Sequence, residues 1–68
     1  MKHYYVNSVP QPNGDHEVHC EGCLWMPSIN NRIHLGIFAS SKEALAAAKW
    51  RYSSADGCMH CCPEIHKH

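Results

Sequence analysis

The sequence predicts a small α+β domain in which an antiparallel sheet of about three strands packs against one α-helix, followed by a cysteine-rich tail. Three observations lead to this fold class. The chain has 68 residues, which is enough for one domain over residues 1–68 and for one hydrophobic core. Three of its segments have the composition or the alternation of strands, and a fourth has helical periodicity behind a capping box.

The strands are expected at residues 3–9, 16–20 and 32–38. Two prolines and the turn-forming pair Asn13-Gly14 separate the first two segments, which predicts a hairpin. In the second segment Glu17 and His19 point to one face, and Val18 points to the other. The third segment alternates strictly, and its apolar side chains are expected to be the sheet's share of the core: Ile33, Leu35 and Ile37.

The helix is expected at residues 41–55. Ser40 and Glu43 have the spacing of a capping box, in which each side chain bonds to the other residue's backbone N–H. Apolar residues then recur at helical spacing and define one face: Leu45, Ala48, Tyr52 and Ala55. Gly57 is expected to end the helix in a left-handed conformation, and residues 57–68 form a Cys/His tail.

So short a chain needs a cross-link to order this tail. A domain of this size buries only about 60% of the surface that its unfolded chain exposes, and its core alone supplies no more than about 3–5 kcal/mol. The sequence contains five cysteines and seven histidines, which are the candidates for such a cross-link. A tail without one is expected to fray.

Two closely spaced cysteine pairs predict a structural zinc site. Cys20-x-x-Cys23 and Cys58-x-x-Cys61 have the spacing of zinc knuckles, and two knuckles complete a tetrahedron of sulfur atoms. The neighbouring residues that offer alternative ligands are Cys62, His60 and His66.

Two other states of the cysteines remain open at this point: reduced thiols and a disulfide. Cys20 shares a face with Val18, so it is equally suited to packing in the core. The odd number of cysteines and the absence of an apolar leader favour reduced thiols in a cytoplasmic protein over a disulfide framework.

Two stretches resemble a family of short bacterial proteins that are rich in cysteine and histidine. They are Asn13–His19 (NGDHEVH) and Gly57–Cys62 (GCMHCC), the latter followed by His66. The resemblance spans nearly the whole chain and implies no particular function. It implies a ligand set in which His66 joins Cys23, Cys58 and Cys61.

The chain also departs from this family at three positions. It has Ser41 and Ile65 where relatives often carry cysteine, and it has Cys20 where they often do not. The resemblance therefore also implies that some relatives have a link between two cysteines, and that this chain lacks that link. The ligands expected from both lines of reasoning are Cys23, Cys58 and Cys61, with Cys20 or His66 as the fourth.

Neither of two enzymatic interpretations fits the motifs. His16-Glu17-Val18-His19 has one residue too few after the glutamate for a zinc-protease motif, and it lies in a predicted strand rather than a helix. The Cys58 pair follows the predicted helix, whereas a thioredoxin-like redox pair precedes one. A non-enzymatic protein is expected.

The predicted function is a small zinc-stabilised interaction module. Trp50 and Trp25 are candidate contacts for a protein partner or for a second copy of the chain. One alternative is a thiol redox or metal-handling protein, and another is a zinc knuckle that binds nucleic acid. The formal net charge of zero disfavours nucleic acid, and no apolar run predicts a membrane segment.

Overall fold

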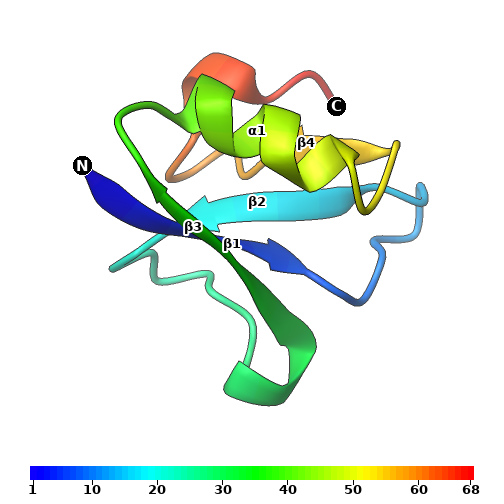
Figure 1. The fold of residues 1–68 in the computed structure, drawn as a ribbon. Helices are drawn as coiled ribbons and strands as arrows, with labels where there is room; N and C mark the ends of the chain where they lie inside the picture. The colour runs from blue at the N-terminus through cyan, green and yellow to red at the C-terminus, as the bar shows by residue number, and fades with distance from the viewer.

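The computed structural model describes all 68 residues and has the predicted α+β class. Its elements in chain order are β1 (Lys2–Asn7), β2 (His16–Cys20), the 3-10 turn η1 (Ile29–Asn31), β3 (Arg32–Phe38), α1 (Ser41–Lys49), β4 (Ala55–Gly57) and the 3-10 turn η2 (Pro63–Ile65). The strands form one sheet in the order β3-β1-β2-β4 (Figure 1). The sheet thus has four strands and not three.

The first three strands pair antiparallel, with β1 between β2 and β3. In the predicted hairpin, Val6 lies opposite Val18, and the connecting turn places Gly14 at a φ of 91°. The pairing of β1 with β3 shifts register between Tyr4 and Tyr5, beside Gly36. This glycine has a φ of 136°, a value that side chains disfavour, which explains why glycine stands at the irregularity.

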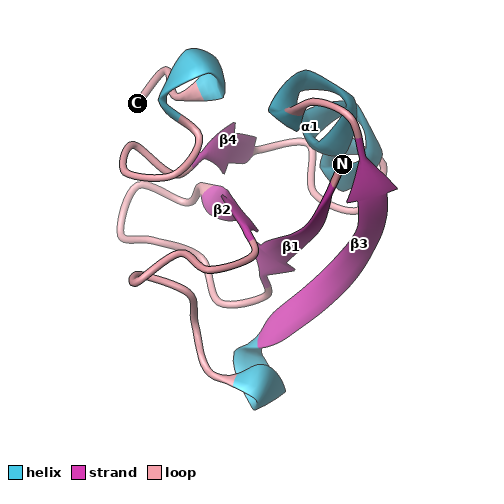
Figure 2. Ribbon diagram, turned by 90° about the vertical axis from the view of Figure 1, so that its left-hand side faces the viewer, coloured by secondary structure: helices cyan, strands magenta, loops and turns pink.

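The fourth strand was not expected from the sequence, and it pairs parallel to β2. Ala55 lies beside His16 and Gly57 beside Val18, and the N–H of Cys58 then donates to the carbonyl of Val18 at 2.9 Å. β2 is therefore a central strand, with β1 on one side and β4 on the other. Because β2 and β4 are parallel, their carboxyl ends lie at the same edge of the sheet (Figure 2).

The helix begins as predicted and ends earlier. The Ser40 hydroxyl accepts the N–H of Glu43 at 3.3 Å, and the Glu43 carboxylate accepts the N–H of Ala39 at 3.1 Å. The helix ends at Lys49 and not at residue 55, because the following turns redirect the chain into β4.

Gly57 has a different role from the predicted helix stop. It has no positive φ and lies within β4. A Cβ atom at this position would lie 2.8 Å from the carbonyl oxygen of Cys62 and would overlap the Ile65 side chain. Glycine is needed here because the chain that follows β4 folds back against it.

The core lies between the sheet and α1, which covers one face (Figure 1). Small helix residues allow this close approach, since Ala44 and Ala48 are fully buried while Leu45 is only half-buried. The core residues are Tyr4, Val6, Val18, Cys20, Ala44, Ala48, Ala55, Cys62 and Ile65. The structure contains no helix with the length and apolarity required to cross a bilayer.

Candidate metal centre

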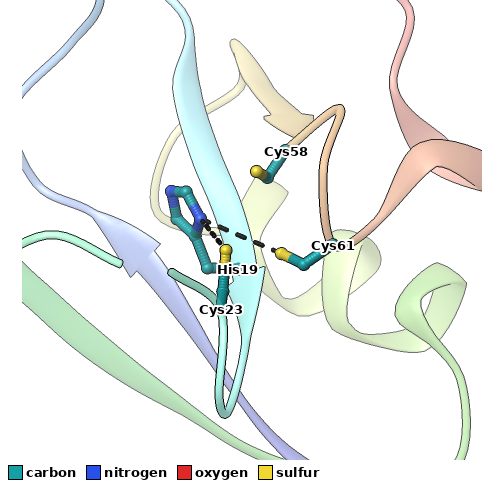
Figure 3. Close-up of side chains that lie close together, drawn as sticks. All are labelled: His19, Cys23, Cys58 and Cys61. Atoms are coloured by element: carbon teal, nitrogen blue, oxygen red, sulfur yellow. Dashed lines mark hydrogen bonds between the residues drawn. The ribbon is translucent and has the colours of Figure 1, made fainter. Parts of the chain in front are cut away.

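Four side chains from two distant parts of the chain converge at the edge where β2 and β4 end. They are His19, Cys23, Cys58 and Cys61, and one ligand atom from each lies within 4.8 Å of the others (Figure 3). We call this group the His19 tetrad. Its buried histidine and three cysteines are consistent with a metal site.

The parallel pairing of β2 and β4 brings two members of the tetrad, His19 and Cys58, side by side. His19 lies near the end of β2, and Cys58 immediately follows β4, so the two residues are neighbours across the strand pair. Because adjacent strand residues point to opposite faces, His19 lies on the face opposite to Val18 and the helix. This placement puts the tetrad outside the apolar core.

Two turns bring in the other two members. After β2, the N–H of Cys23 donates to the carbonyl of Cys20 at 3.2 Å. After β4, the N–H of Cys62 donates to the carbonyl of Cys58 at 2.8 Å, and Cys61 lies within that turn. Each turn thus returns a sulfur atom toward the strand end that precedes it.

The measured spacing fits a tetrahedral ion. With ligands at about 2.3 Å for sulfur and about 2.0 Å for nitrogen, neighbouring donor atoms in a tetrahedron lie about 3.5–3.8 Å apart. The Nδ1 atom of His19 lies 3.5 Å from the Cys23 sulfur and 3.9 Å from the Cys61 sulfur (Figure 3). A single ring nitrogen that faces two sulfur atoms is the arrangement expected around a shared cation.

Burial keeps the His19 ring neutral and leaves Nδ1 free to bind an ion. The residue is only 1% exposed, and burial lowers its pKa below the usual value. Its other ring nitrogen, Nε2, lies 3.4 Å from the Glu17 carboxylate, which projects from the same face of β2. A carboxylate behind a histidine ligand is the usual second partner in metal sites, where it fixes the ring's orientation.

Backbone N–H groups point at two of the sulfur atoms. Trp25 donates to the Cys23 sulfur, and Cys20 donates to the Cys61 sulfur, both at 3.4 Å. Burial nevertheless raises the pKa of Cys58 and of Cys61, and backbone hydrogen bonds oppose the rise only in part. These thiols therefore stay protonated at neutral pH unless a cation replaces their protons.

The structure brings His19 to the three predicted cysteines and does not bring Cys20 or His66. Cys20 points to the opposite face and joins the core. The Nδ1 atom of His66 lies 2.9 Å from the Gly57 carbonyl oxygen and 3.4 Å from the Asp56 carboxylate, in a separate cluster. In the structure it is therefore His19, and neither Cys20 nor His66, that lies together with all three of these cysteines.

The two alternates, Cys62 and His60, also lie outside the tetrad. Cys62 is fully buried in the core, with its sulfur 3.8 Å from that of Cys61. His60 is exposed and stacks on Trp25, with 4.7 Å between ring centroids. All five cysteines are free thiols in the structure.

Sequence reasoning missed His19 although one signal was present. His19 precedes Cys23 by four residues and belongs to the same segment as Cys20, so it reaches the same strand end. The burial of His19 depends on β2 being a central strand, which the sequence does not indicate.

Of the two tryptophans, Trp25 lies beside the tetrad and Trp50 lies at the end of α1. Trp25 is 61% exposed and, with His60, lines a pocket of about 240 Å³ beside Cys23 and Cys61. Trp50 is 91% exposed at the end of α1, so the tail does not fold back over it.

No protein-family model matches the chain, and neither a curated protein nor a solved structure is found to match it.

Proposed function

We propose that the protein is a small interaction module stabilised by one structural zinc ion in the His19 tetrad. The observation that supports this proposal is the convergence of one imidazole nitrogen and three sulfur atoms within 4.8 Å of one another. Zinc prefers this set of nitrogen and sulfur ligands and this coordination number.

The ligand count favours a structural role over a catalytic one. Four protein ligands complete a tetrahedron, whereas catalytic zinc keeps a position open for water or substrate. The proposed function is for this reason not that of a metalloenzyme.

The ion would fasten the end of the chain to the sheet. Only 15 of the 68 residues are buried, so the core is small for a stable domain. Cys58 and Cys61 belong to the last part of the chain, whereas His19 belongs to the first hairpin and Cys23 to the turn that follows it. A zinc ion held by both parts replaces the stabilisation that a larger core would give.

The surface beside the tetrad supports a role in binding another protein. Leu24 is 96% exposed, and Met59 is also exposed, so both ligand-bearing turns present apolar side chains to solvent. The stacked rings of Trp25 and His60 join the two turns across the pocket. Exposed aromatic and apolar groups around a pocket are typical of protein contact sites.

Both alternative functions have weaker support. A thiol redox function requires accessible thiolates of low pKa, but burial raises the pKa of Cys61 and raises that of Cys62 to about 12. Nucleic-acid binding requires a positive surface, and the formal charge is zero.

Native mass spectrometry of untagged protein, purified under reducing conditions, tests the zinc site. We expect one retained zinc ion per chain, and we expect a strong chelator to lower the melting temperature because the tail loses its attachment. His19→Ala should lose the ion, whereas His66→Ala is the matched control and should keep it. A protein without zinc, or a His19→Ala variant that binds zinc as tightly as the original chain, would refute the proposed site.

Sedimentation equilibrium of the zinc-loaded protein tests the surface. A dimer that dissociates in a Leu24→Ser, Trp25→Ala variant would identify a second copy as the partner. If the protein is a monomer and these substitutions change neither its zinc content nor its melting temperature, the exposed side chains have no structural role. That result is expected if the surface binds a different protein. A melting temperature that drops in this variant would contradict the proposed surface.

A further inference from the structure

A second group of sulfur atoms lies next to the tetrad and shares one member with it. The sulfur atoms of Cys20, Cys61 and Cys62 lie within 4.8 Å of one another, and those of Cys61 and Cys62 are 3.8 Å apart. No other histidine, cysteine or carboxylate atom joins this group. Three thiolates around an ion in their own plane, at about 2.3 Å each, would lie about 4.0 Å apart.

The two groups lie on opposite sides of the end of β2. His19 and Cys20 are adjacent strand residues, so His19 faces the tetrad and Cys20 faces the core beneath α1. Cys61 lies at the strand end between them. Its sulfur is 3.9 Å from the His19 ring nitrogen, and it also accepts the backbone N–H of Cys20 at 3.4 Å.

We propose that Cys20, Cys61 and Cys62 form a second metal site, specific for a soft monovalent cation of the Cu(I) type, in which the Cys61 thiolate bridges the two ions. Soft thiolate ligands select Cu(I). A second zinc ion would need a fourth donor, and the group supplies only three. The burial of Cys20 and Cys62 in the apolar core disfavours water as that fourth donor.

Loading this site is a ligand exchange without electron transfer. Copper arrives as Cu(I) on a carrier ligand and remains Cu(I). New bonds form to the sulfur atoms of Cys20, Cys62 and Cys61, the carrier ligand leaves, and the thiol protons of Cys20 and Cys62 pass to solvent. The site rests on the proposed zinc function only through the bridge at Cys61.

An anaerobic titration of the zinc-loaded protein with Cu(I), buffered by bicinchoninate and followed by native mass spectrometry, tests the proposal. We expect a species with one zinc and one copper per chain. At the copper K-edge, X-ray absorption should show three sulfur neighbours and a zinc atom beyond them. Release of one zinc for each copper bound, or a copper shell that contains nitrogen or only two sulfur atoms, would overturn the second site.

Substitutions separate the two sites. Cys62→Ala and Cys20→Ala should each weaken copper binding at least tenfold and leave one zinc bound, while His60→Ala, the nearby surface control, should change neither. His19→Ala should lose zinc and keep copper. Copper binding that survives in both alanine variants, or a two-dalton mass loss from a disulfide in place of copper, would overturn the proposal.

The two proposals fail in distinguishable ways. If the wild-type protein binds copper through Cys20 and Cys62 but never retains zinc, the zinc function fails and the copper site stands without its bridge. If zinc is retained but copper displaces it, the copper site fails alone. The absorption measurement uses only the wild-type chain, so the test stands even if a core variant does not fold.

Discussion

His19 differs from the other six histidines in how completely the fold encloses it, since all the others are half-buried or exposed. Enclosure has two consequences for this residue. It lowers the pKa of the ring, so that the imidazole is neutral and can offer a lone pair. It also places the two ring nitrogens beside different partners, the sulfur atoms at Nδ1 and the Glu17 carboxylate at Nε2.

Removal of the Glu17 carboxylate should weaken zinc binding without removing a ligand. We expect Glu17→Ala to lower the affinity for zinc by about 10–100-fold, the usual loss when a ligand's outer partner is removed, and Glu17→Gln to recover part of it. Competition with a chromophoric chelator measures the affinity. Glu21→Gln, which alters a nearby carboxylate that bonds to the His3 backbone, is the control. An unchanged affinity in Glu17→Ala would show that the carboxylate does not position the ring.

At the scale of the elements, the three residues of β4 decide where the site lies. Ala, Asp and Gly are poor strand formers, so the segment is a strand only because β2 offers it a hydrogen-bonding edge. The Asp56 carboxylate then accepts the backbone N–H groups of Lys67 and His68, which ties the last residues to β4. One short strand thus places Cys58 at the tetrad and anchors the chain beyond it.

Gly57→Ala tests how tightly the returning chain packs on β4. The added methyl group would overlap Ile65 and approach the Cys62 carbonyl oxygen to 2.8 Å. We expect a loss of about 1–3 kcal/mol in the free energy of unfolding, the usual cost of overpacking, together with weaker zinc binding because Cys58 follows directly. Urea denaturation measures the first effect, and Ser53→Ala at an exposed turn is the control. Wild-type stability in Gly57→Ala would contradict this packing.

For the whole molecule, the proposed zinc ion and the small core would stabilise the fold from opposite faces of the sheet. The apolar cluster lies between α1 and one face of the sheet, while the His19 tetrad closes the opposite face at the end of β2 and β4. The chain that returns through η2 lies against both β4 and α1 (Figure 2). Loss of the ion would therefore loosen the attachment of the entire C-terminal part and not a single loop.

Above pH 7, where the buried His19 ring is already neutral, the zinc-loaded and metal-free proteins should respond to pH in opposite directions. In the metal-free protein, burial raises the pKa of Cys58, Cys61 and Cys62. A raised folded-state pKa means that stability is complete below the unfolded thiol pKa of about 8.5 and declines as pH rises above it. In the zinc-loaded protein, protons compete with the ion, so stability declines as pH falls.

Melting temperatures recorded from pH 7 to pH 10, with zinc and with a chelator, measure these two trends. Two curves that decline on the same side would contradict a site in which zinc replaces thiol protons. A Cys58→Ser variant should lose most of the difference between the curves, because it removes both a ligand and one of the raised pKa values.

The sequence by itself determined the features that local chemistry encodes. The Ser40–Glu43 box predicted the start of the helix, and alternation and turn residues predicted the hairpin and the third strand. Cysteine spacing indicated Cys20, Cys23, Cys58 and Cys61 as a group, of which all but Cys20 belong to the tetrad. Only the tertiary structure decided that β4 exists, that the helix ends at Lys49, and that His19 completes the tetrad. The physical reason is range: caps, turns and periodicity act between neighbours in sequence, whereas the burial of His19 and the pairing of β4 depend on segments about 40 residues apart.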